Sequence, residues 1–126
     1  MDTLIKLKQL EQESIARGIP ILGSKKGAWL LQKIQQVKPQ QILELGTANG
    51  YSGCILGSAG AELTTIEVNA IIAEEARQNF KKYGIKAQVL MGDAVEITKR
   101  LAEHGSLRSV VAHCGAFGIG RPRWPA

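Results

Sequence analysis

The stretch from residue 41 to residue 53 reads QILELGTANGYSG. Its first five residues predict a short β-strand, because they are mostly apolar and are followed at once by a turn. The strand runs directly into a loop of small residues, 46–50, and a helix is expected to begin near Tyr51. A strand that passes through a glycine loop into a helix opens a βαβ unit, so this stretch predicts an α/β fold.

The chain after this stretch continues the alternation. Residues 63–68 are rich in β-branched residues and predict a second strand. Apolar residues recur at helical spacing over 73–83, and Gly84 is the expected end of that helix. A third strand is expected at 87–91, and another helix follows it. This order predicts right-handed crossovers and a parallel sheet with helices on its faces, a Rossmann-like doubly wound fold.

The chain before residue 39 is expected to be helical. Leucines at helical spacing predict one helix over residues 2–16. A second helix follows Ser24, its expected N-cap, and closes before Pro39. Residues 1–38 are therefore expected to form a helical prelude to a cofactor-binding core at 39–103.

The final segment, residues 104–126, has a different composition, with four Gly, two Pro, three Arg and no acid. We expect a fourth short strand at 107–112 and then an irregular tail. The whole is expected to be a single domain, residues 1–126, that holds a truncated sheet of three to four strands and is incomplete.

Composition and charge exclude several classes. The 126 residues are 44% hydrophobic and 21% charged, which is typical of a globular protein. The apolar runs are far shorter than the ~20 residues of a membrane span, so no membrane contact is expected. The N-terminal residues do not resemble a secretory signal, which predicts a cytoplasmic protein. The net charge of +5 comes mostly from the final segment, and no basic stripe is interleaved with aromatics, so no nucleic-acid partner is expected.

Three features fall at the edge where the carboxyl ends of parallel strands meet, which is where open α/β sheets bind ligands. They are the glycine loop, Glu67 at the end of the second strand and Asp93 just after the third. Gly46 and Gly50 would let the main chain turn tightly and approach a ligand. Glu67 is placed to accept from both ribose hydroxyls, and Asp93 would accept from an adenine amine. Together they predict an adenosine-shaped pocket.

Each feature also has an ordinary structural explanation. A glycine-rich turn after a strand is often only a turn. Glu67 and Asp93 could be solvated acids, and Asp93 could be a helix N-cap. Their common placement along one sheet edge is what favours nucleoside binding.

The loop does not fit a dinucleotide. The fingerprint G-x-G-x-x-G has a second glycine where this chain has Ala48, so an NAD-dependent enzyme is a minor alternative. Glu44 places a carboxylate near the loop, which would repel a pyrophosphate but suit an ammonium or a sulfonium group. The residues therefore favour S-adenosylmethionine as the cofactor.

Three strings, ILELGTANGYSG, LTTIEVNAIIAEEARQNFKKYG and VLMGDAVEI, resemble the first three motifs of class I S-adenosylmethionine-dependent methyltransferases. The similarity is greatest to the O-methyltransferases of the catechol and caffeoyl-CoA type, and it covers roughly residues 19–103. The resemblance implies these cofactor-binding residues: Leu22, Glu44, Gly46, Thr47, Gly50, Tyr51, Ser52, Glu67, Asp93 and Ala94.

The resemblance also implies a role for each group. Glu44 would hold the methionine amino group, and the glycine loop would pass under the cofactor. Leu22, Tyr51 and Ser52 would lie along its methionine part. Glu67 would take the ribose diol, and the residues at 93–94 would border the adenine.

The family further implies a divalent cation, bound by an aspartate after the fourth strand. This chain has no carboxylate after Glu103, so no metal ligand is assigned. His113 and Cys114 point in divergent directions if they lie on a strand, so they are not expected to form a metal or catalytic pair. The loss of acids and lysines in this segment predicts a truncated or frame-shifted gene product.

Two functions from different classes follow. The first is a methyltransferase that moves a methyl group from S-adenosylmethionine to an oxygen of a small-molecule acceptor, with cofactor binding better retained than turnover. No catalytic residue is assigned. The second is a non-catalytic S-adenosylmethionine-binding module or assembly partner, whose uncovered apolar faces are buried in a homodimer or by another chain.

Overall fold

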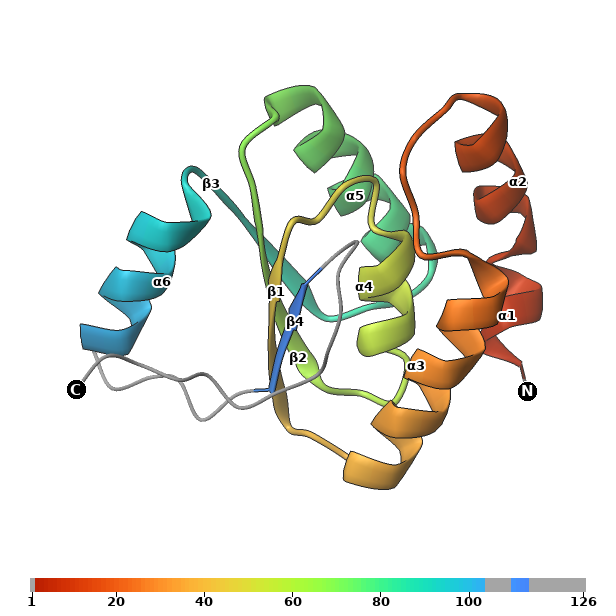
Figure 1. Ribbon diagram of the computed structural model, residues 1–126, viewed down its shortest axis with the longest axis horizontal. Coiled ribbons are helices and arrows are strands. Elements are labelled where there is room, and N and C mark those ends of the chain that lie inside the picture. Colours follow the sequence, from red (N-terminus) through yellow and green to blue (C-terminus); the bar gives the residue numbers. More distant parts are fainter. Residues whose placement is uncertain (1, 104–109, 114–126) are drawn as a thin grey trace.

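The computed structural model describes residues 2–103 and 110–113, and within them four parallel strands form one sheet (Figure 1). The strands are β1 (Gln41–Leu45), β2 (Glu62–Glu67), β3 (Ala87–Met91) and β4 (Val110–His113). Their order across the sheet is β3-β2-β1-β4. The expected Rossmann-like parallel sheet is confirmed.

The strands end level with one another at their carboxyl ends. Leu45 of β1 pairs with Ile66 of β2, and Glu67 of β2 pairs with Met91 of β3. The loops that follow these three strands therefore leave the sheet at one edge, as the sequence predicts.

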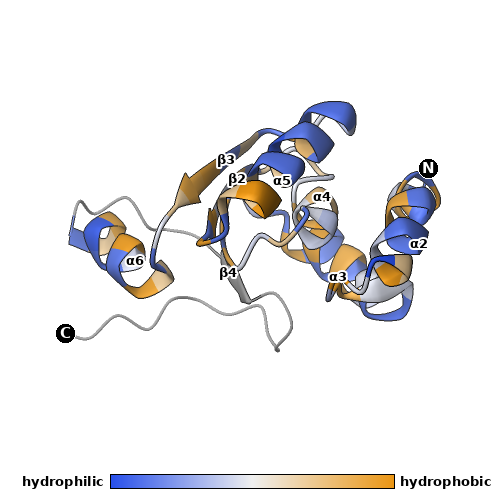
Figure 2. Ribbon diagram, turned by 90° about the horizontal axis from the view of Figure 1, so that it is seen from above, coloured by the Kyte–Doolittle hydropathy of each residue, from blue (hydrophilic) through white to orange (hydrophobic). Residues whose placement is uncertain are grey.

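Helices cover both faces of the sheet. Three of them follow strands: α4 (Tyr51–Leu56), α5 (Ala70–Lys82) and α6 (Ala94–Glu103). The chain moves from β1 to β3 in one direction and then returns past both strands to β4, so right-handed crossovers place α6 on the face opposite α4 and α5. Figure 2 shows α6 on that opposite side. The reversal between β1 and β4 is the topological switch point, next to which open sheets bind ligands.

Three helices precede the sheet: α1 (Thr3–Lys6), α2 (Lys8–Ala16) and α3 (Gly23–Val37). The single helix expected over residues 2–16 is wrong in one respect, because it is divided at Leu7. Leu7 has torsions of φ −90° and ψ 0°, outside the helical region, and its side chain is buried in the core.

The start of α3 also differs from the expectation. Ser24 lies inside the helix rather than at its N-cap, and Leu22 occupies the N-cap position without a side-chain cap bond. Leu22 already has helical torsions and packs against the core, which explains why the helix begins two residues early. The end of α3 before Pro39 is confirmed, since Lys38 adopts a left-handed conformation there.

The core lies between the sheet and the helices α3, α4 and α5. Ile42 and Leu63 from the strands pack in one cluster with Ile55 and Phe80 from the helices. A Cβ at Gly53 of α4 would lie 2.7 Å from two ring atoms of Phe80 and 3.0 Å from the Leu63 side chain. The glycine therefore permits α4 and α5 to approach closely.

The expected irregular tail, including Cys114, lies outside the described residues. β4 (Val110–His113) overlaps the fourth strand that the sequence predicts at 107–112 and extends one residue beyond it. None of the described helices has both the length and the apolar character needed to cross a membrane.

The substitution Gly53→Ala is expected to lower the free energy of unfolding by about 1–3 kcal/mol, the usual cost of overpacking a core. Urea denaturation followed by circular dichroism measures this change. Adding Phe80→Leu removes the ring that the new methyl group meets, so the double variant is expected to lose less stability than the sum of the two single variants. Strict additivity would contradict the packing argument.

Candidate functional site

The glycine loop (residues 46–50) leaves β1 and crosses over the end of β2. The N–H groups of Gly46 and Thr47 both donate to the Ile66 carbonyl, at 3.0 and 3.2 Å. Gly46, Ala48 and Gly50 have positive φ values of 87°, 47° and 93°. Glycine adopts this conformation without strain, whereas Ala48 is a non-glycine residue for which it is uncommon.

Gly50 is required by the protein's own packing. A Cβ at this position would lie 3.1 Å from the Phe80 ring and 3.4 Å from the main chain of Ala76. The close approach of a ligand to Gly50 therefore stays a prediction, because the fold alone already demands a glycine there.

The Glu67 carboxylate lies against the glycine loop. Its Oε1 accepts from the Ala48 N–H at 2.9 Å, and its Oε2 accepts from the N–H groups of Val68 and Asn69 at 3.0 Å each. A carboxylate has about four acceptor positions, so three are used. A diol that bonded both oxygens would have to replace at least one of these bonds.

Asp93 lies on the same rim as Glu67. The Gly92 N–H donates to the Glu67 carbonyl at 3.1 Å, which places the turn after β3 beside the end of β2. Asp93 is exposed, and its Oδ1 accepts from the Glu96 N–H at 2.9 Å, so it does cap α6. Ala94 begins α6 and is half-buried. Any contact of these two residues with adenine stays a prediction.

Glu44 is buried beneath the loop, with 1% of its surface exposed. Ser52 Oγ donates to its Oε2 at 2.5 Å, and Thr65 Oγ1 donates to its Oε1 at 2.8 Å. Thr47 Oγ1 lies 2.6 Å from Thr65 Oγ1. When Glu44 is ionised, Thr47 is the donor of this bond, because the single Thr65 proton is then used on Glu44. One carboxylate therefore joins β1, β2, α4 and the glycine loop.

Burial raises the pKa of Glu44 to about 7. The Ser52 and Thr65 hydroxyls oppose this rise, whereas the nearby Glu67 carboxylate adds to it. No Lys or Arg of the described chain is among the groups that shift this pKa. A buried carboxylate that titrates near neutrality without a cationic partner favours a cation placed close to it.

Two of the expected residues direct their side chains elsewhere. The Tyr51 side chain is buried, and its hydroxyl donates to Glu11 of α2 at 3.0 Å. Burial and the Glu11 carboxylate both raise the pKa of Tyr51 well above its ordinary value. Leu22 is half-buried against the core at the start of α3. Their contacts with a cofactor stay predictions, and Tyr51 could offer only its main chain.

Some residues at this edge are not among those predicted from the sequence. Thr65 lies opposite Glu44 in the register of β1 and β2, so aligning the strand ends could have identified it. Val68, Ile71 and Met91 expose 76%, 79% and 40% of their surface beside the two acids. Only Val68 has a clear sequence signal, because it is an apolar residue directly after the strand-end acid Glu67.

A cleft of about 760 Å³ lies at the opposite edge of the sheet. Lys38, Gln41, Glu62 and Lys86 are among the residues that line it. These residues lie at or beside the amino ends of the strands, so this cleft is separate from the glycine loop.

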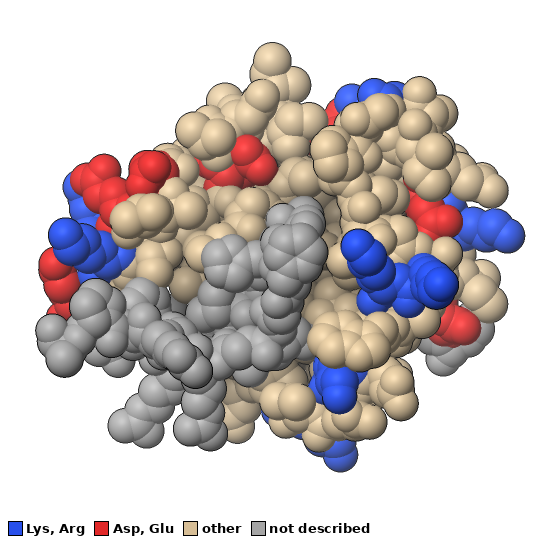
Figure 3. Space-filling view, viewed as in Figure 1, with Lys and Arg blue, Asp and Glu red and all other residues tan. Residues whose placement is uncertain are grey.

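No metal centre is evident in the described part of the chain, and one face of the molecule shows how the basic side chains are distributed. Residues 2–103 and 110–113 contain no group of three or more His, Cys, Asp or Glu that could hold a metal ion. A divalent cation is therefore not supported there. On the face shown in Figure 3, Lys and Arg side chains occur in separate groups among acidic and uncharged side chains. The expectation against a nucleic-acid partner stays a prediction.

Comparison with known sequences identifies methyltransferases. No protein-family model matches the chain. Two curated relatives are protein-L-isoaspartate O-methyltransferases. The one from Stenotrophomonas maltophilia (strain K279a) is 30% identical over 89 residues, 71% of this chain and 38% of the relative. The one from Xylella fastidiosa (strain M12) is 42% identical over 59 residues, 47% of this chain and 28% of the relative. The chain thus matches well under half the length of either.

Solved structures show the same fold. A putative caffeoyl-CoA O-methyltransferase from Staphylococcus aureus has a TM-score of 0.68 and 26% identity, and the match covers 80% of this chain and 49% of that one. The O-methyltransferase TomG from Streptomyces achromogenes, solved in complex with S-adenosylmethionine, has a TM-score of 0.65 and 27% identity over 75% and 46% of the two chains. The described residues therefore correspond to about half of such a methyltransferase.

Glu44 is expected to make stability depend on pH. The protonated form is favoured in the folded chain, so its stabilising effect is complete below pH 4.5 and is lost as the pH rises through about 7. The loss is on the order of 3 kcal/mol, since one pKa unit corresponds to about 1.4 kcal/mol.

Urea unfolding at pH 5 and pH 8 measures this effect. Glu44→Gln stays neutral at both pH values, so it is expected to reduce the difference between them. Glu62→Gln, at the exposed amino end of β2, is the control and should keep the wild-type difference. An unchanged difference in Glu44→Gln would contradict the assignment.

Proposed function

We propose that this chain, whose fold is that of the cofactor-binding half of class I S-adenosylmethionine-dependent methyltransferases, binds S-adenosylmethionine at the glycine loop. The observation that carries the proposal is the pair of carboxylates, Glu44 and Glu67, that meet at this loop from neighbouring strands. The described part of the chain offers Glu44 no cationic partner.

The donor set fits this cofactor. Glu67 makes the carboxyl edge negative, and a cation beside Glu44 would favour its ionised form, so both acids favour a ligand that carries an ammonium and a sulfonium group. Glu67 retains an acceptor position on Oε1 for a ribose hydroxyl. Val68, Ile71 and Met91 offer apolar surface beside it for a flat base, and Asp93 would accept from the exocyclic amine.

The remaining roles follow from the resemblance. Gly46, Thr47 and Gly50 would pass beneath the cofactor, and Ser52 would act through its bond to Glu44. Ala94 would border the base. Leu22 and the main chain of Tyr51 would lie along the methionine part.

The proposed reaction is O-methylation. When bound, S-adenosylmethionine supplies a methyl group on a sulfonium, which an acceptor oxygen can take in a displacement with the sulfur as leaving group. The part played by this chain is to hold and orient the donor, and alignment is the main source of rate in such a step. We assign a small-molecule acceptor from the resemblance to the catechol and caffeoyl-CoA type. Because no catalytic residue is assigned in the described part of the chain, cofactor binding is expected to be easier to detect than turnover.

A second candidate is a non-catalytic binding module or assembly partner. It is favoured by the apolar side chains that Val68, Ile71 and Met91 expose at the carboxyl edge, because a partner would bury them. In that case the chain would work in a homodimer or with another chain.

Size-exclusion chromatography with light scattering separates the two candidates. The first candidate predicts a monomer of 13.6 kDa that binds S-adenosylmethionine. A stable dimer that does not methylate any small acceptor would favour the second candidate. A clean monomer with cofactor affinity would contradict it.

Titration calorimetry tests cofactor binding directly. Both S-adenosylmethionine and S-adenosylhomocysteine are expected to bind at one site. Glu67→Ala is expected to weaken binding about 10- to 100-fold, because a hydrogen bond to a charged group contributes about 1.5–3 kcal/mol.

Glu62→Ala is the matched control, since Glu62 lies on the same strand at its exposed amino end. It should leave the affinity unchanged. Absence of binding heat at several temperatures, in a sample shown to be folded by circular dichroism, would overturn the proposed function.

A further inference from the structure

We propose that Ser14 of α2 is a positioning residue for the cofactor site. Through Asn49 it fixes the glycine loop in the conformation that holds the Glu67 carboxylate. The inference rests on the proposed role of Glu67 and gives the helical prelude a part in that site.

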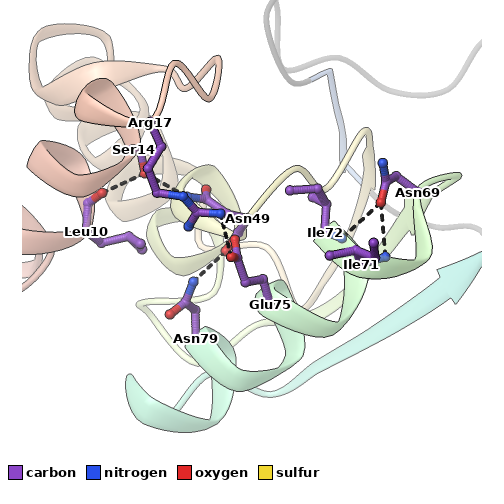
Figure 4. Close-up of polar contacts among 9 residues, drawn as sticks. All are labelled: Leu10, Ser14, Arg17, Asn49, Asn69, Ile71, Ile72, Glu75 and Asn79. Carbon is purple, nitrogen blue, oxygen red and sulfur yellow. Dashed lines mark hydrogen bonds and ion pairs between the residues drawn. The ribbon is translucent and has the colours of Figure 1, made fainter.

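The first observation is a buried hydrogen-bonded link between α2 and the glycine loop. Asn49 Nδ2 donates to Ser14 Oγ at 2.7 Å, and both residues are 1% exposed. Ser14 Oγ donates in turn to the Leu10 carbonyl at 2.6 Å, which fixes the direction of its hydroxyl. Figure 4 shows this chain of contacts passing from α2 to the loop.

The second observation is that α5 holds the same loop residue from another side. Asn79 Nδ2 donates to the Asn49 carbonyl at 2.8 Å. One turn earlier on α5, Glu75 forms an ion pair with Arg17 of α2 at 2.7 Å (Figure 4). The Arg17 side chain is 55% exposed, so this pair adds little, and the buried Ser14 link is the stronger constraint.

The third observation is that this arrangement is costly for the fold. Asn49 Oδ1 is buried without a hydrogen-bond partner, which costs about 1–3 kcal/mol. The preceding residue, Ala48, is held in the left-handed conformation, which adds strain. An alanine at position 49 would avoid the unpaired oxygen. The asparagine side chain is therefore better explained by holding the loop than by stabilising the core.

The link continues to the proposed ribose acceptor. The Ala48 N–H, directly before Asn49, donates to Glu67 Oε1 at 2.9 Å. A loop released from Ser14 could rotate away from this carboxylate. Coupling between two sites is reciprocal, so a ligand that orders Glu67 must also stabilise α2. In this path of hydrogen bonds, α2 reaches Glu67 only through the glycine loop.

The test compares Ser14→Ala with Ser58→Ala in the 126-residue chain. Ser58 Oγ also donates to a main-chain carbonyl three residues before it, that of Ile55 at 2.7 Å, but Ser58 lies just beyond the end of α4, away from the loop. The measurements are calorimetry with S-adenosylhomocysteine and amide exchange followed residue by residue by NMR.

In wild type and Ser58→Ala, S-adenosylhomocysteine is expected to slow exchange in the loop and also in α2. In Ser14→Ala, the affinity should fall about 5- to 20-fold and the protection of α2 should vanish. Protection of α2 that persists in Ser14→Ala would overturn the proposal.

A double variant separates positioning from stability. Ser14→Ala with Asn49→Ala removes the donor, its acceptor and the unpaired oxygen together, so the unfolding midpoint should return toward that of wild type. The affinity should stay low. Affinity that recovers with stability would show a merely structural role and overturn the proposal.

Failure of the proposed function is distinguishable from failure of this inference. If folded wild type binds no cofactor, the proposed function fails. The positioning of the loop is then judged without ligand, by the exchange rate of the Ala48 amide. A rate that rises in Ser14→Ala but not in Ser58→Ala supports the inference, and equal rates in the two variants overturn it.

Discussion

The carboxyl edge of the sheet depends on one buried acid. Glu44 receives hydrogen bonds from Ser52 of α4 and Thr65 of β2, and Thr47 of the glycine loop joins the same network. Burying a carboxylate is unfavourable unless its acceptor positions are used, so the four segments must come together for the acid to be tolerated. The position of the loop above β1 and β2 is a direct consequence.

The parallel sheet and the edge that carries the site follow from sequence pattern, because short apolar strands bounded by turns alternate with helices, whereas the strand order comes from the structure. The division at Leu7 and the early start of α3 do not follow, since tertiary packing overrides helical spacing and capping preference at those points. At the site, the convergence of Glu44 and Glu67 on one loop could be predicted. The hydrogen bonds from Tyr51 to Glu11 and from Thr65 to Glu44 could not be predicted, because both join segments far apart in the chain.

The similar proteins and the geometry of the glycine loop both favour S-adenosylmethionine as the cofactor. They do not identify the molecule that would accept the methyl group. The curated relatives are named for a protein acceptor, whereas one of the similar structures is named for a coenzyme A ester. Both names denote methyl transfer to oxygen. The two O-methyltransferase structures share the fold of this chain over 75% to 80% of its length.

The hydroxyl chain of Thr47 and Thr65 has a direction. When Glu44 is ionised, the Thr65 hydroxyl donates to Glu44 and the Thr47 hydroxyl donates to Thr65. If Glu44 gains a proton on Oε1, that oxygen becomes a donor, Thr65 must accept, and both threonine dipoles reverse. The orientation of the Thr47 hydroxyl in the glycine loop therefore depends on whether the buried Glu44 carboxyl is ionised.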